Sequence, residues 1–279
     1  MLEKQFGLSP IDDISVSEPE VPELSIRMIE GTDTYGKFIA EPLDKGWGVT
    51  LGNPLRRTLL SGLPGTAINW VKIEGIEHEY STLKGMREEV NEFLMNAKGI
   101  RLRSLSDRSG RLRLEVEGEG EVKAGDIMAT ADFEIVNPGH HLATLDSSDA
   151  HLSVEFSVEQ GQGYKKATEE DDTNIGVLPI DSIFTPIKKA NFSVQPTRVG
   201  QRSDWERLTL EIWTDGSIDP QSALQKASES LMDNFYTFSK FDQASEEQSP
   251  AAGLGISPDI YNTPVETLDL SARTLNCLK

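Results

Sequence analysis

A leucine-rich helix bounded by glycines constrains the fold of this chain more than any other segment. It lies in residues 46–65, where Leu51, Leu55 and Leu59 recur every four residues and therefore share one helical face. Leu60 adds apolar surface in a neighbouring direction, so the segment carries more than packing on one sheet requires. The surplus predicts a partner for this helix, and an ordinary core helix is the alternative.

The same helix carries a proline and two adjacent arginines. Because proline is tolerated in a first turn, Pro54 predicts that the regular helix begins near Asn53, which would cap it. Arg56 and Arg57 leave the helix in neighbouring directions. The segment lacks the glycine and lysine spacing of a phosphate-binding loop. Its residue types leave open whether the arginines are solvated or contact a partner.

Several segments alternate apolar and polar residues, as strands with one solvated face do. A hairpin is predicted over 24–43, and clean alternation continues in 111–117, 152–158 and 207–213. A glycine pair predicts a turn over 161–164. Together with the helices, these patterns predict an α+β fold with antiparallel sheets.

Two further helices are predicted, over about 86–98 and 220–241. The second begins with Asp219 as its cap and Pro220 at its first position. Its apolar stripe consists of Leu224, Ala227, Leu231, Phe235 and Phe238. Spacing alone favours packing of this stripe on the chain's own sheet over a seam between two copies.

Composition excludes several classes of protein. A formal charge of -19 argues against broad electrostatic binding to nucleic acid, which depends on lysine and arginine. The single Cys277 excludes an internal disulfide and fits a reducing cytosol. No apolar run reaches the roughly 18 residues that a membrane span needs. We expect a soluble, cytoplasmic protein that does not associate with membranes.

Candidates for chemistry are few. The four histidines lack the spacing of a helical zinc site. Asp171 and Asp172 could hold magnesium, but a solvated acidic loop is the simpler interpretation. We predict no catalytic, metal-binding or cofactor-binding residue and no cofactor. An assembly subunit is favoured, and an enzyme acting through Asp171, Asp172 and a histidine is the alternative.

The segment from Glu41 to Gly65 resembles the signature of RNA polymerase α subunits of the bacterial and plastid type. It contains Glu41-Pro42-Leu43, then Gly-Asn-x-Leu-Arg-Arg-x-Leu-Leu over 52–60, and Pro64-Gly65. Further stretches that resemble the family follow at 78–82, 94–99, 132–138, 161–164, 175–176, 186 and 215–220. The resemblance covers nearly the whole chain.

The resemblance implies a particular division of the chain. A dimerisation domain with an antiparallel sheet and two helices would combine 22–64 with 187–242; before it, the acidic composition of 1–21, with few apolar residues, itself predicts a flexible tail. A mostly β domain would be inserted at 65–186. A linker at 243–263 would lead to 264–279, the start of a truncated carboxy-terminal DNA-binding domain.

The resemblance also implies a function in transcription. The chain would homodimerise and form the platform on which the β and β′ subunits assemble, with ω and σ in the holoenzyme, without itself being catalytic. Arg57, Leu60 and, less directly, Lys98 would contact a large subunit. The dimer interface would include Leu51, Leu55, Leu59, Leu224, Leu231, Phe235 and Phe238.

Contact with promoter DNA would come from the carboxy-terminal segment. There Arg273, Asn276 and Lys279 match positions that meet the minor groove and backbone in the family. The sequence ends before the rest of that small domain, so we expect DNA binding to be weak or absent. The protein would be cytoplasmic and reach the nucleoid through the polymerase.

Overall fold

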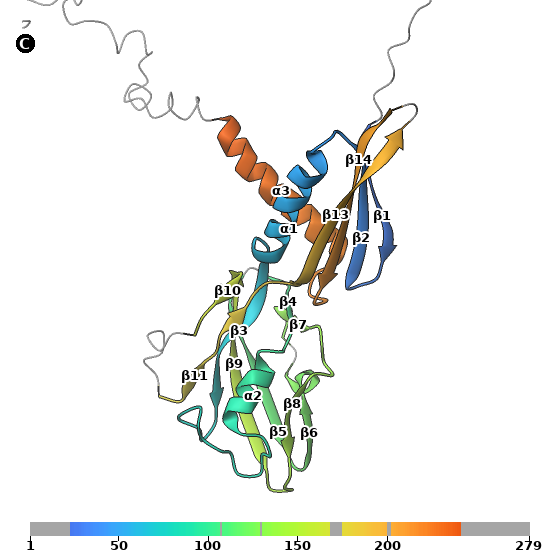
Figure 1. Ribbon diagram of the computed structural model, residues 1–279. Coiled ribbons are helices and arrows are strands. Elements are labelled where there is room, and N and C mark those ends of the chain that lie inside the picture. Colours follow the sequence, from blue (N-terminus) through green and yellow to red (C-terminus); the bar gives the residue numbers. More distant parts are fainter. Residues whose placement is uncertain (1–22, 107, 129, 168–174, 200–201, 241–279) are drawn as a thin grey trace, which may run out of the picture.

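The computed structural model describes residues 23–106, 108–128, 130–167, 175–199 and 202–240. These residues form two bodies, each built on an antiparallel sheet (Figure 1). The α+β fold expected from the alternating and helical patterns is confirmed. The predicted tail, the linker and the carboxy-terminal segment with Arg273, Asn276 and Lys279 lie outside the described residues, as do Asp171 and Asp172.

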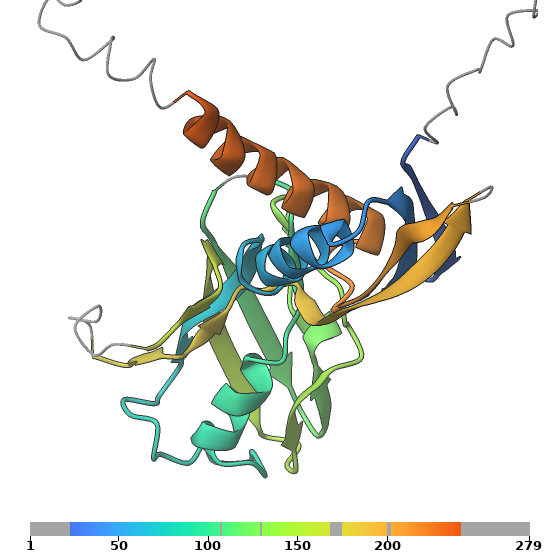
Figure 2. The same ribbon diagram turned by 45° about the horizontal axis from the view of Figure 1, so that its top comes forward.

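The first, which we call the helical body, combines segments from both ends of the described chain. Its elements are β1 (Ser25–Gly31), β2 (Tyr35–Leu43), α1 (Trp47–Ser61), β13 (Ile187–Val199), β14 (Arg202–Thr214) and α3 (Pro220–Ser239). The strands pair in the order β1-β2-β14-β13, and β1 and β2 form the predicted hairpin. Both helices lie on one face of this sheet, and α3 crosses α1 (Figure 2).

The second, which we call the sheet body, is mostly β and carries one short helix, α2 (Val90–Ala97). Its main sheet has the order β5-β9-β3-β4-β7, with β11 paired to β3, and two small sheets pair β6 with β8 and β10 with β12. The strands are β3 (Pro64–Ile73), β4 (Leu102–Ser104), β5 (Gly110–Glu117), β6 (Gly120–Lys123), β7 (Phe133–Ile135), β8 (His141–Leu145), β9 (His151–Gln162), β10 (Tyr164–Lys165), β11 (Val177–Pro179) and β12 (Ser182–Ile183). A single 3-10 turn, η1 (Ala124–Asp126), follows β6.

Each body has its own core. In the sheet body, the rings of Phe93 on α2 and Phe156 on β9 stack with centroids 6.3 Å apart, and both side chains are fully buried. In the helical body, Leu59 on α1 and Ala227 on α3 are buried against Ile212 of the sheet. Two separate apolar clusters therefore stabilise two separately packed bodies.

Three local predictions were wrong. The helix α1 begins at Trp47, not near Asn53, so Pro54 lies inside it. The helix α2 begins at Val90, because the preceding residues pair with β8: Arg87 donates from its backbone to Thr144. The turn expected over 161–164 is confined to Gly163, at φ +70°, since β9 continues to Gln162 and β10 begins at Tyr164.

Candidate functional site

A carboxylate from β14 fixes the start of α1. The backbone N–H groups of Gly46 and Gly48 each donate to one carboxylate oxygen of Glu206, at 2.9 Å. A negative charge at a helix N-terminus satisfies free donors and complements the helix dipole. This cap comes from a residue 160 positions away along the chain, which explains why the local sequence predicts a later start.

Two glycines let α1 lie close to β13. A Cβ added at Gly48 would stand 2.6 Å from Val194 Cγ1, and one added at Gly52 would stand 2.5 Å from the Phe192 ring. Neither distance leaves room for a side chain. The face of the helix that carries the two glycines thus packs on the sheet, and its other faces are available for other contacts.

The two adjacent arginines have different environments. The Nε of Arg56 donates to the carbonyl oxygen of Ala190 at 3.0 Å and ties α1 to β13. Arg57 is exposed, and its guanidinium forms no hydrogen bond or ion pair with any residue that the structure describes. Leu60, three residues later near the end of α1, is half-buried. Within the described part of the chain, the Arg57 guanidinium is therefore not used to hold elements together.

The leucines predicted for the dimer interface on α1 differ in exposure. Leu59 has no exposed surface and lies in the chain's own core. Leu51 and Leu55 are half-buried and retain accessible surface.

The third predicted contact, Lys98, follows α2 in the sheet body. Its Nζ forms an ion pair with Asp181 Oδ2 at 2.8 Å, and its side chain is 33% exposed. The Lys98 ammonium and the backbone N–H of Ala167 hold the pKa of the Asp181 carboxyl below its usual value. Lys98 thus already has a partner in the chain, in contrast to Arg57.

The helix α3 divides into a packed half and a free half. Asp219 caps its N-terminus by accepting a hydrogen bond from the Ser222 N–H at 2.9 Å, as predicted, and Ala223 and Ala227 are buried beneath it. Its last turns extend beyond the sheet and α1 (Figures 1 and 2). There the exposed fraction is 63% for Phe235 and 79% for Phe238.

Sequence reasoning missed several exposed apolar residues. On α3, Met232 and Tyr236 flank the predicted stripe and are mostly exposed. On the edge strand β1, all seven residues are exposed, including Ile26 and Met28, whose alternation had predicted a half-buried strand. No local signal could have revealed this, because the alternation is the same whether or not a second layer covers the strand.

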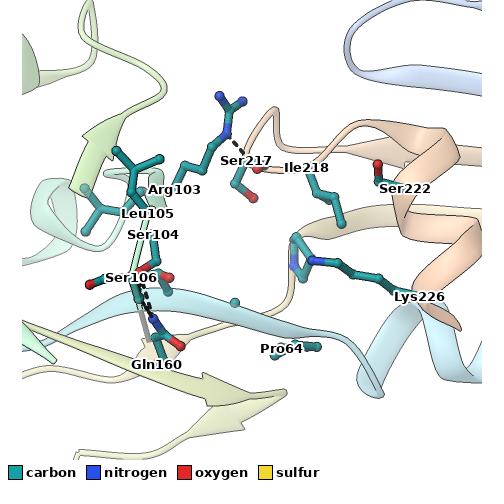
Figure 3. Close-up of a pocket in the computed structure, with 14 residues that line it drawn as sticks. Pro64, Arg103, Ser104, Leu105, Ser106, Gln160, Ser217, Ile218, Ser222 and Lys226 are labelled. Carbon is teal, nitrogen blue, oxygen red and sulfur yellow. Dashed lines mark hydrogen bonds between the residues drawn. The ribbon is translucent and has the colours of Figure 1, made fainter. Parts of the chain in front are cut away.

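A cavity of about 490 Å³ lies where the two bodies meet (Figure 3). Its walls come from the start of β3, from β4 and the residues after it, and from the loop and first turns of α3. None of its 14 lining residues is an aspartate, glutamate, histidine or cysteine. The cavity therefore lacks the side chains that most often act as general acids, general bases or metal ligands.

The histidines make ordinary contacts. His140 bonds the carbonyl oxygen of Asn96 at 2.8 Å, and His141 lies between Glu88 and Glu121. Within the described part of the chain, no three histidine, cysteine or acidic side chains are grouped so as to hold a metal ion. The helices described there are also too short or too polar to cross a membrane.

Comparison with known proteins gives consistent matches. Residues 71–185, within the sheet body, match the family model described as the RNA polymerase Rpb3/RpoA insert domain. The chain is 49% identical over 257 residues to the DNA-directed RNA polymerase subunit alpha of Roseiflexus sp. (strain RS-1), covering 91% of this chain and 80% of that protein. It is 48% identical to the protein of that name from Herpetosiphon aurantiacus, and the match covers 91% of this chain and 78% of that protein. It is 45% identical to the protein of that name from Dehalococcoides mccartyi, and the match covers 95% of this chain and 80% of that protein.

Proposed function

The chain belongs to the α-subunit family of DNA-directed RNA polymerase, and we propose that it acts there as a homodimeric platform for the β and β′ subunits. In this proposal the helical body is the dimerisation domain, made from 22–64 and 187–242, and 65–186 form the inserted domain. The chain contributes assembly, and its partners contribute the chemistry of nucleotide transfer.

The observation that carries this proposal is the free half of α3. Burying one exposed aromatic side chain is worth about 1.5–3 kcal/mol, so leaving several in water is costly. A two-fold axis doubles the effect, because each copy contributes the same patch to the interface. We propose that Leu224, Leu231, Phe235 and Phe238 meet their counterparts in a second copy, with Leu51 and Leu55 beside them and without the fully buried Leu59.

A single charge in this patch tests the dimer. Phe235→Glu would place an unpaired carboxylate in the seam and should yield monomers in analytical ultracentrifugation at micromolar concentration. The fold should survive, because the Phe235 side chain is already mostly exposed in one copy.

The matched control is Thr237→Glu. Thr237 is exposed and lies nearly opposite Phe235 around the helix, so the same charge should leave the dimer intact. A Phe235→Glu chain that still sediments as a dimer would refute the proposed seam. Mixing each variant with β and β′ and measuring transcription then tests whether assembly requires the dimer.

Arg57 and Leu60 support the second half of the proposal. A guanidinium pairs well with carboxylates of a partner, and an adjacent leucine can fill an apolar pocket. Arg57 is free to do so, whereas Lys98 would have to give up or share Asp181. We therefore propose Arg57 and Leu60 as the principal large-subunit contacts, with Lys98 as an auxiliary one.

A further inference from the structure

The chain passes between the helical body and the sheet body twice, and the two crossings lie side by side. One follows α1 into β3, and the other leads from β12 into β13. At these crossings Thr185 Oγ1 donates to the carbonyl oxygen of Leu60 at 2.8 Å. A Cβ on Gly65 would stand only 1.7 Å from the carbonyl oxygen of Phe184. Two adjacent strands of chain define an axis, and alone they would allow the bodies to rotate about it.

Contacts between the two bodies are few, and they gather near the crossings and the loop that precedes α3. Among the described residues, extensive contact between elements is confined to pairs within one body. Next to the crossings, where the bodies face each other, lies the cavity of about 490 Å³ in place of interlocked side chains. Pro64, Gly65 and Pro186 line it on the side of the crossings.

Arg103 bridges the bodies on another side of this cavity. It extends from β4 of the sheet body to the loop that precedes α3 (Figure 3). Its Nε donates to the carbonyl oxygen of Ser217 at 3.0 Å, and its Nη2 donates to that of Gly216 at 2.9 Å. Its remaining Nη1 donates to Glu134 of the neighbouring β7 at 2.9 Å. The planar guanidinium thus forms an ion pair within its own sheet and donates hydrogen bonds to two successive carbonyl groups of the other body.

The loop to which Arg103 donates is also held by contacts of its own. The Asp215 carboxylate accepts hydrogen bonds from the N–H and hydroxyl of Ser217, and its other oxygen lies 3.8 Å from Arg101 Nε. Gly216 has φ +96°, and a Cβ there would meet Val136 of the sheet body at 2.9 Å. The loop ends at Asp219, which caps α3, so the position of the loop also determines where that helix begins.

We propose that Arg103 is a positioning residue that fixes the angle between the two bodies. The two crossings supply an axis, and beside Pro186 of the second crossing Arg103, together with the Arg101–Asp215 ion pair, attaches the 215–217 loop to the sheet body. Because the guanidinium holds two successive carbonyl groups of the helical body and a carboxylate of the sheet body, a rotation about the crossings would break these hydrogen bonds. The consequence for assembly rests on the proposed function: Arg57 and Lys98 stand on different bodies, so one partner can meet both only at a defined angle.

Electron paramagnetic resonance distances test this directly on the full chain. Spin labels go on Met95→Cys, exposed on α2, and Ser193→Cys, exposed on β13, in a Cys277→Ser background. Labelled chains are diluted with an excess of unlabelled chains, so that only distances within one chain are measured. Arg103→Gln should broaden the distance distribution at least twofold or shift its maximum. Arg103→Lys, which keeps the charge without the fork, should broaden it less.

The matched control is Arg111→Gln, which removes an exposed arginine that pairs with Glu155 within one sheet, and its distribution should equal that of the parent. Unchanged distributions in both Arg103 variants would overturn the proposal. Far-ultraviolet circular dichroism verifies that each variant is folded, and Arg103→Lys serves if Arg103→Gln does not fold. The measurement needs no large subunit, so its failure is distinguishable from a failure of the proposed docking function.

Discussion

At the scale of single residues, the placement of α1 depends on two glycines, which have no Cβ atom. Gly48 and Gly52 have no side chains, and the helix approaches β13 to a distance that any Cβ would prevent. Glycine costs about 1 kcal/mol relative to alanine inside a helix. The fold accepts that cost because the close approach lets Arg56 reach the carbonyl oxygen of Ala190 and Glu206 reach the start of the helix.

Gly52→Ala should therefore destabilise the protein although alanine is the better helix former. The new methyl group would overlap the Phe192 ring, and overpacking of this kind costs about 1–3 kcal/mol. Urea unfolding at a fixed protein concentration should show the loss. Gly139→Ala is the control, because a Cβ there meets nothing within 4 Å and its stability should change by less than about 0.5 kcal/mol. Equal stability of both variants would contradict the close-packing argument.

At the scale of elements, the sequence predicts what is locally encoded. The β1–β2 hairpin and the alternating strands appear as expected, and Asp219 and Pro220 begin α3 where the capping pattern places its start. The start of α1 was wrong because Glu206, distant in sequence, supplies the cap. The exposure of β1 and of the end of α3 depends on which layers cover them, and a repeating pattern carries no information on that.

The cap of α3 predicts a pH-dependent contribution to stability. Hydrogen bonds from the Ser222 hydroxyl and N–H lower the pKa of Asp219, so its contribution is present above the unfolded pKa of about 3.9. The contribution is lost as the pH falls through the still lower pKa of the folded state. Asp219→Ala should thus cost about 1 kcal/mol at pH 7, and the difference from the parent should shrink as the pH falls below about 4.

Thermal or urea unfolding of both proteins between pH 7 and pH 3 measures this difference. Asp219→Asn, which keeps a capping oxygen without the charge, should retain most of the stability at pH 7. A penalty for Asp219→Ala that stays constant down to pH 3 would show that the carboxylate does not act as the cap.

At the scale of the whole molecule, the candidate site spreads over both bodies. The sequence supplied the candidates through resemblance, which named Arg57 and not Arg56, whereas the residue types alone left both arginines open. The packing of α1 supplies a physical reason for the difference, since the Arg56 guanidinium binds β13 and that of Arg57 has no partner among the described residues. Likewise, the importance of Arg103 arises from the meeting of two bodies, and nothing in its local sequence marks it.

The free cation on a chain of net charge -19 leads to a prediction for assembly. If Arg57 pairs with carboxylates of a large subunit, Arg57→Ala should weaken binding of the β subunit roughly 10- to 100-fold, the equivalent of about 1.4–2.8 kcal/mol. Arg57→Lys should recover part of the loss, because a lysine keeps the charge but cannot form the bidentate contact.

Added salt should weaken binding by the parent more than binding by Arg57→Ala, since only the parent has the charge pair to screen. Arg113→Ala removes another exposed arginine, from β5, and should leave the affinity unchanged. Titration calorimetry with the β subunit provides the affinities, and ultracentrifugation verifies that each variant keeps the oligomeric state of the parent. Equal affinities for Arg57→Ala and Arg113→Ala would remove Arg57 from the proposed docking surface while leaving the proposed dimer seam on α3 untouched, because the two proposed surfaces share no residue.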